Sequence, residues 1–362
     1  MDLCGIRCYG GYATSEDAHV DVDVREGGGL SLLEGALGPP SKFSEGGDMS
    51  LYVGVDLGGT NIVSGIVDEE GRILARDKRP TRQDLGLEES IGQMKESIRA
   101  VVGQARGSVR AIGIGSPGPI DPFEGIVLEP ENLPAWRNVP LVRIMEEEFE
   151  VPAFLDNDAN VAALGEQWQG AGKGVRFFMC VTLGTGIGGG AVLDGKLLQG
   201  FNGNAAEIGH ITIDYDGPPC PCGNRGCLEL YASATGIVRR TKEMMERERP
   251  ETSLWEKFEN LTAKDISEAA HDGDEFARRM YGETGFLLGV GLVSAINLYN
   301  VEVIALGGGM AQAGEILFEP VRRTVRERAL PGVRDKVRIV PSQLGDDAGL
   351  LGAARMATQR AG

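Results

Sequence analysis

Three cysteines and one histidine lie within a stretch of 23 residues, and no other feature of this sequence restricts the fold as strongly. The stretch runs from Glu207 to Glu229 and reads EIGHITIDYDGPPCPCGNRGCLE. Its candidate metal ligands are His210, Cys220, Cys222 and Cys227. Three thiolates and an imidazole suit tetrahedral Zn²⁺ and complete its coordination shell. A complete shell is typical of a structural metal, so we expect this loop to fold around zinc.

The spacing of these cysteines leaves a second interpretation open. C-x-C-x4-C differs from the C-x2-C spacing of the common zinc knuckle, and the cysteines of an ordinary loop are free or disulfide-bonded. Gly223 and Gly226 lie between Cys222 and Cys227, where the chain must turn tightly for the sulfurs to converge. The density of ligands favours zinc.

The composition excludes several classes of protein. The 362 residues are enough for two domains, and a hydrophobic fraction of 42% is ordinary for a globular protein. We find neither a charge-free apolar run of about 18 residues nor a basic segment followed by an apolar one at the amino end. We therefore expect a cytoplasmic protein. The net charge of -17 argues against a nucleic-acid partner, whereas a nucleotide could bind through backbone amides and a divalent ion.

Residues 1–48 differ from the rest of the chain. They are glycine-rich and acidic, and they lack a sustained helical or strand period. We interpret them as a flexible tail. A wrongly assigned upstream start codon is the second interpretation, because Met49 directly precedes the first clear strand. Cys4, Cys8 and His19 would be the ligands of a second metal site, but no periodic pattern holds them together.

A glycine turn follows the first strand of the α/β region that begins at Leu51. Strands are predicted before and after the turn LGGTN, which brings together Asp56, Gly58, Gly59, Thr60 and Asn61. The glycines let a phosphate approach the backbone, the Thr and Asn donate hydrogen bonds, and the Asp can hold Mg²⁺ through water. The turn lacks the lysine of G-x4-G-K-[ST] and opens no helix. Alone, such a turn is as often only a tight hairpin.

Two more glycine turns follow buried strands. A second hairpin is predicted around Gly184, Thr185 and Gly186, so the same device occurs twice and suggests two related halves that face one nucleotide. The strand from Val301 to Leu306 ends in three glycines, whose backbone could closely approach the adenine or the ribose: Gly307, Gly308 and Gly309.

Asp158 is the candidate catalytic base. It lies where a predicted strand ends and a helix begins, the position at which open α/β sheets gather ligands. The alternative, a residue that only caps the helix, suits Asp156 or Asn160. Trp136, in a proline-bounded loop, has two interpretations: it stacks on a sugar ring or it packs locally.

Six motifs in order resemble the ROK family of bacterial sugar kinases and repressors, from about Leu51 to the end of the chain. They are DLGGTN from Asp56, SPGP from Ser116, DNDAN from Asp156, TLGTGIGGG from Thr182, EIGH from Glu207 and CPCGNRGCLE from Cys220. The resemblance implies an α/β fold, the actin-like (ribonuclease H-like) pair of domains with nucleotide and sugar in the cleft. The expected domains are 49–165 joined by the helix 347–362, and 166–346 with the zinc loop. A homodimer or homotetramer is also implied.

Among family members the chain is similar to ATP-dependent glucokinases. This implies transfer of the γ-phosphate of Mg·ATP to the 6-hydroxyl of glucose, the entry to glycolysis, with Asp158 as general base. The residues that resemble the family's sugar-binding set are Gly118, Asn157, Asp158, Glu207, His210 and Glu229, and the two glycine hairpins resemble its phosphate-binding turns. The alternatives are a kinase for N-acetylmannosamine, fructose or allose, and a sugar-sensing repressor. The acidic residues 1–48 argue against the repressor, because they show no helix-turn-helix period.

Overall fold

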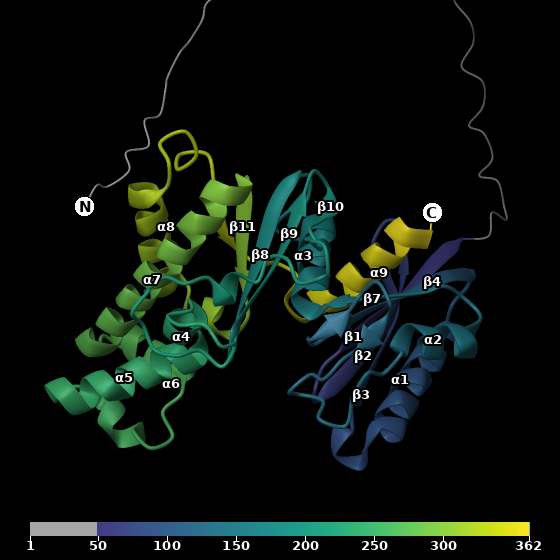
Figure 1. Cartoon of the computed structure of the whole chain (residues 1–362), viewed down its shortest axis with the longest axis horizontal. Helices are drawn as coiled ribbons and strands as arrows, with labels where there is room; N and C mark the ends of the chain where they lie inside the picture. Colours follow the sequence, from purple (N-terminus) through teal and green to yellow (C-terminus); the bar gives the residue numbers. More distant parts are fainter. Residues whose placement is uncertain (1–48, 362) are drawn as a thin grey trace, which may run out of the picture. The chain divides into compact units, whose positions relative to one another are not determined.

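Two five-stranded sheets organise the chain in the computed structural model, which describes residues 49–361 (Figure 1). The interpretations of residues 1–48 concern a part of the sequence outside this range. The first sheet contains, in spatial order, β3 (Ile73–Pro80), β2 (Asn61–Asp68), β1 (Ser50–Leu57), β4 (Ser108–Ser116) and β7 (Ala153–Asn157). The second contains β10 (Lys196–Leu197), β9 (Ile187–Leu193), β8 (Phe177–Leu183), β11 (Val303–Gly307) and β12 (Arg338–Pro341). A small ribbon pairs β5 (Ile120–Asp121) with β6 (Ile126–Val127).

Helices connect and cover these strands. The α-helices are α1 (Leu87–Val102), α2 (Leu141–Phe149), α3 (Asp158–Gln169), α4 (Glu229–Ala232), α5 (Ala234–Glu248), α6 (Ala263–His271), α7 (Glu275–Tyr299), α8 (Glu315–Arg328) and α9 (Ala348–Ala361). The short 3₁₀ helices are η1 (Gln83–Leu85), η2 (Ile208–His210), η3 (Ser253–Lys257), η4 (Gly309–Ala313) and η5 (Gly345–Asp347). None of the helices in the described range combines the length and apolar character needed to cross a bilayer.

The two sheets share one pattern of strand pairing. In the first, β1 pairs antiparallel with β2 and parallel with β4. In the second, β8 pairs antiparallel with β9 and parallel with β11. Both hairpins expected from the glycine turns are therefore present, and each places its turn at the carboxyl end of a central strand. This is the edge of a sheet where α/β folds gather ligands.

Strand alternation divides each sheet between two layers of helix. In β1, Leu51 and Val53 belong to the core that includes Met94 of α1, whereas Tyr52 packs with Leu350 of α9. Successive side chains of a strand point to opposite faces, so α1 and α9 cover opposite sides of the first sheet (Figure 1). The second sheet follows the same rule, with Val181 in the core shared with α7 and α8 and with Cys180 facing α3.

Helices α3 and α9 approach each other unusually closely, and this contact lies beside both sheets. A Cβ at Gly352 of α9 would lie 1.5 Å from the backbone oxygen of Val161, and one at Gly165 of α3 would lie 2.2 Å from the oxygen of Ala348. Only glycine permits this approach. Because Asp158 begins α3, the spacing of the two helices also determines where this candidate base lies.

Replacing Gly352 by alanine is expected to destabilise the protein by about 1–3 kcal/mol, because the new methyl group must push two backbones apart. The urea midpoint of unfolding measures the effect. Gly92→Ala is the matched control, since Gly92 lies inside α1 and a Cβ at this position would have nothing within 4 Å. That change should be neutral or stabilise by up to about 1 kcal/mol. Equal midpoints for the two variants would contradict the packing described for α3 and α9.

The structure decides one open interpretation and contains one helix that was not predicted. Trp136 is 0% exposed and belongs to the core of the first sheet, so the interpretation as a sugar-stacking residue is wrong and local packing is correct. Helix α2 was not predicted. It has nine residues and follows Pro140, and it is capped by Glu150, which takes the left-handed conformation usually provided by glycine, so the ordinary stop signal is missing.

Candidate active site

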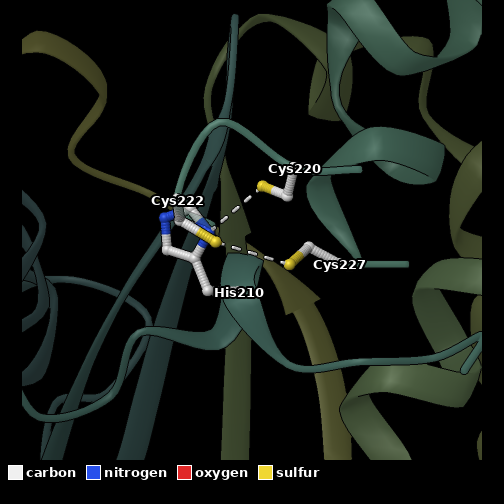
Figure 2. Close-up of side chains that lie close together, drawn as sticks. All are labelled: His210, Cys220, Cys222 and Cys227. Carbon is white, nitrogen blue, oxygen red and sulfur yellow. Dashed lines mark hydrogen bonds between the residues drawn. The ribbon is translucent and has the colours of Figure 1, made fainter. Parts of the chain in front are cut away.

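The histidine and the three cysteines of the loop converge, as the sequence predicted (Figure 2). One ligand atom from each of His210, Cys220, Cys222 and Cys227 lies within 4.8 Å of the others. The sulfurs of Cys222 and Cys227 are 3.7 Å apart, and the sulfur of Cys220 is 3.8 Å from Nδ1 of His210. Zinc–sulfur bonds of about 2.3 Å in a tetrahedron place two sulfurs about 3.8 Å apart. The donor set therefore fits zinc in chemistry and in spacing.

Backbone bonds shape the cysteine loop. The amide of Cys220 donates to the oxygen of Asn224 at 2.8 Å, and the amide of Gly223 donates back to the oxygen of Cys220 at 3.0 Å. Gly223 has φ of +92° and Gly226 has φ of +63°, values that favour glycine. A bridge between Thr212 and Cys227 ties the end of the loop to the segment that follows His210. The sequence thus folds the four donors toward one point.

Glu229 and Glu207 lie at the two ends of this loop. Oε1 of Glu229 is 3.6 Å from Nδ1 of His210 and 3.5 Å from the sulfur of Cys220. Burial raises the pKa of Glu207, His210 lowers it, and the carboxylates of Asp158 and Glu229 raise it further. Charge effects weaken with distance, so the shift is consistent with a position of Glu207 near the carboxylates of Asp158 and Glu229.

Asp158 begins α3 directly after β7. Asn157 is the helix cap, because its side chain accepts from the amide of Ala159 at 2.9 Å; the cap is neither Asp156 nor Asn160. An oxygen of Asp158 accepts from the same amide at 2.8 Å. The side chain of Asp158 is accessible to solvent, and it lines a cavity whose walls are other parts of the protein. Burial in these walls raises the pKa of Asp158.

Asn157 and the SPGP turn lie together. A Cβ at Gly118 would be 3.5 Å from Nδ2 of Asn157, so the turn after β4 borders the cap of α3. The second glycine hairpin reaches the same region from the other sheet. A Cβ at Gly186 would lie 2.9 Å from Oε2 of Glu229, and one at Gly188 would lie 3.1 Å from Cβ of Ala159.

A cavity of about 540 Å³ gathers carboxylates from the first sheet, from α3 and from η5. Asp56 at the end of β1, Asp158 at the start of α3 and Asp346 in η5 line it together with the glycine turn after β11. Burial, followed by the carboxylates of Asp158 and Asp346, raises the pKa of Asp56 to about 6, and Arg76 opposes the rise. The described residues that line the cavity include no Lys, Arg or His. Oxygen donors at this density fit Mg²⁺, which would balance their charge.

A second cavity of about 690 Å³ adjoins the first, because Gly309 and Gln312 line both. Gly184 and Thr185 of the second hairpin form part of its wall, and apolar side chains such as Leu183 form much of the rest. A large, mostly apolar space with a few polar groups is typical of a small-molecule site and is large enough for a nucleoside.

The first glycine turn occupies a different place. Gly58, Gly59, Thr60 and Asn61 do not line either of these two cavities, and a Cβ at Gly59 would lie 2.8 Å from the oxygen of Asn132. Their role with phosphate stays a prediction. Sequence reasoning missed Asp346. An acidic pair directly before the last helix was the available signal, since Asp346 and Asp347 precede Ala348.

The chain is similar to known proteins over nearly all of its described length. The family model described as ROK family matches residues 52–360. A glucokinase of Thermotoga maritima is 41% identical over 86% of this chain and 98% of its own length. A xylose repressor of Caldicellulosiruptor bescii is 31% identical over 85% of this chain and 78% of its own length.

Solved structures agree. A ROK family glucokinase from Streptomyces griseus in complex with glucose and AMPPNP matches with a TM-score of 0.70 and 37% identity, covering 85% of this chain and 99% of that one. The likeness confirms the expected actin-like ATPase fold, with its paired α/β sheets. With a family match from residue 52 to residue 360 and a relative 41% identical across 98% of its length, this chain belongs to the ROK family.

Proposed function

We propose that this protein is an ATP-dependent glucokinase that phosphorylates the 6-hydroxyl of glucose. The observation that carries the proposal is that the second glycine hairpin borders both Glu229, which pairs with His210, and Ala159, which follows Asp158, beside a carboxylate-lined cavity that continues into an apolar one. The Thermotoga maritima relative, described as a glucokinase, and the Streptomyces griseus structure with glucose and AMPPNP support it. A cytoplasmic location and a homodimer or homotetramer stay predictions.

The sugar is held by groups of the cysteine loop. Zinc, when bound by His210, Cys220, Cys222 and Cys227, supplies structural cross-linking of that loop. Nδ1 of His210 faces the thiols, so Nε2 carries the proton and donates to a sugar hydroxyl. Glu207 and Glu229 accept from neighbouring hydroxyls, and Gly118 and Asn157, which lie beside each other, contact the sugar as well. These bonds orient the sugar before any chemistry takes place.

Asp158 then takes the proton of the 6-hydroxyl. The freed oxygen forms a bond to the γ-phosphorus of ATP while the bond from that phosphorus to the β,γ-bridging oxygen breaks, which leaves ADP and glucose 6-phosphate. Asp56 would hold Mg²⁺, which would neutralise the charge of the phosphates. The second cavity holds the nucleoside, and the amides of the glycine turns that line the two cavities, at Gly184 and at Gly307, donate to phosphate or ribose oxygens. A contact of the first glycine turn with phosphate stays a prediction.

A panel of sugars tests this proposal. With Mg·ATP in a coupled assay of ADP release, kcat/KM is expected to be at least about tenfold higher for glucose than for N-acetylmannosamine, fructose or allose, because a site built to bond each hydroxyl rejects a sugar that misplaces one. If the protein preferred another hexose, the assignment as a sugar kinase would stand and the assignment of glucose as its substrate would be wrong. The absence of turnover with every sugar would favour a sensor like the xylose repressor relative.

A further inference from the structure

Asp156 is a fully buried carboxylate to which none of the roles above has been given. Its side chain is 0% exposed at the end of β7, two residues before Asp158. Burial raises its pKa, and four groups that contact the carboxylate oppose the rise. Burying a carboxylate costs free energy, and the cost is offset only when both oxygens accept hydrogen bonds from donors inside the protein.

The two oxygens of Asp156 serve different parts of the site. Oδ1 accepts from the amide of Asn157 and from Nδ2 of Asn160, both at 2.9 Å, and so fixes the first turn of α3. Oδ2 accepts from Nε2 of Gln199 at 2.6 Å and from Nη2 of Arg360 at 3.3 Å. Gln199 follows β10 of the second sheet, and Arg360 lies near the end of α9. One carboxylate therefore joins the turn that begins with Asp158 to an element of the other sheet.

Gln199 begins the loop that leads to the sugar-binding acids. The amide of Ala205 donates to the oxygen of Gln199 at 3.2 Å, which closes residues 199–205 into a compact loop two residues before Glu207. At Gly203 a Cβ would lie 2.4 Å from the ring of Pro122, so the far side of the loop also rests on the part of the chain that follows the SPGP turn. Two polar bonds hold the start of the loop: the side-chain bond from Gln199 to Asp156, and the backbone bond from the amide of Leu198 to the oxygen of Ala191 at 2.8 Å.

We propose that Asp156 is a positioning residue that holds the loop 199–205, and with it Glu207, in register with Asp158. The inference rests on the proposed function for its kinetic effect, but the attachment itself is independent of it. The bond from Gln199 is made to a charged group inside the protein. Its loss should therefore change the equilibrium between the attached and the detached loop by a factor of about ten to a hundred, in favour of the detached loop.

Gln199→Ala tests the inference, because it removes the attachment of the loop and leaves both bonds of Oδ1 intact. We expect kcat/KM for glucose to fall about ten- to hundredfold while KM for ATP changes by less than about twofold. Amide hydrogen exchange of the full chain should become faster in residues 200–206 and stay unchanged in the first turn of α3. Gln359→Ala is the matched control, since Gln359 is exposed in a cavity that Gln199 and Arg360 also line, and it makes no bond to Asp156.

The outcomes separate this inference from the proposed function. If the wild-type protein phosphorylates no sugar, the exchange data still decide whether Asp156 holds the loop. Unchanged exchange in residues 200–206 would overturn the inference. So would a lower melting temperature of Gln199→Ala with wild-type kcat/KM, because a merely structural bond alters stability without moving the sugar.

Discussion

Asp158→Asn is expected to lower kcat for glucose phosphorylation by about 10²- to 10⁴-fold, the contribution of a positioned general base. The amide keeps the size of the side chain and can still accept from the amide of Ala159, but it cannot take the proton of the 6-hydroxyl. KM for glucose should change little, because Glu207, His210 and Glu229 remain. Steady-state kinetics beside a melting curve measure both effects.

Asp84→Asn makes the same chemical change at an exposed position of η1, which lines neither of the two cavities of the site. This variant should keep wild-type kinetics. If Asp158→Asn also kept the wild-type kcat, Asp158 would have no part in the proton transfer. If kcat fell because Asp158→Asn no longer folds, the pH profile of the wild-type protein would decide whether Asp158 acts as the base.

The direction in which kcat/KM changes with pH follows from the environment of Asp158. Burial raises the pKa of Asp158 above the ordinary value of 3.8. The base acts in its ionised form, so kcat/KM is lost as the pH falls through this raised pKa, at a higher pH than for an ordinary aspartate. The effect on stability is opposite: the folded state binds the proton more tightly than the unfolded state, so the free energy of unfolding decreases as the pH rises through the same range.

The parts that sequence reasoning identified are those whose signal lies within one short stretch. Each glycine hairpin carries its strands and its turn within one short segment, residues 50–68 and 177–193, and the register Leu57 to Ile62 joins residues that are close in sequence. The cysteine loop is local in the same way. Spacing and residue type are then sufficient, because few conformations of a short segment satisfy them together.

The parts that it missed depend on contacts between distant segments. Asp346 becomes part of the site only because the fold brings η5 beside Asp56. The four partners of Asp156 come from β7, α3, the loop after β10 and α9. Trp136 was left with two interpretations for the same reason, since the prolines around it indicated a loop and only side chains from the first sheet, which enclose the indole, decide for packing. The pattern of residues within one segment does not indicate which side chains from distant segments will pack against it.

Zinc removal is the second change with a large expected effect, because the same loop that binds the metal presents His210 and Glu229. Cys227 is 0% exposed, and its sulfur lies 3.7 Å from that of Cys222. Cys227→Ser replaces a thiolate by a poor ligand inside the cluster. We expect the purified variant to lose its zinc, measured by metal analysis, and kcat/KM for glucose to fall by about a hundredfold or more, since outer partners of metal sites alone are worth about 10- to 100-fold.

Cys180→Ser separates metal binding from the cost of a buried hydroxyl. Cys180 is 2% exposed in β8 and lies outside the cluster, so this variant should keep the zinc content of the wild-type protein although its stability falls. Retention of zinc by Cys227→Ser, or a wild-type protein without zinc, would contradict the metal site. If zinc were lost while glucose turnover stayed normal, the backbone bonds within the loop would suffice to orient His210 and Glu229, and the metal would contribute to stability alone.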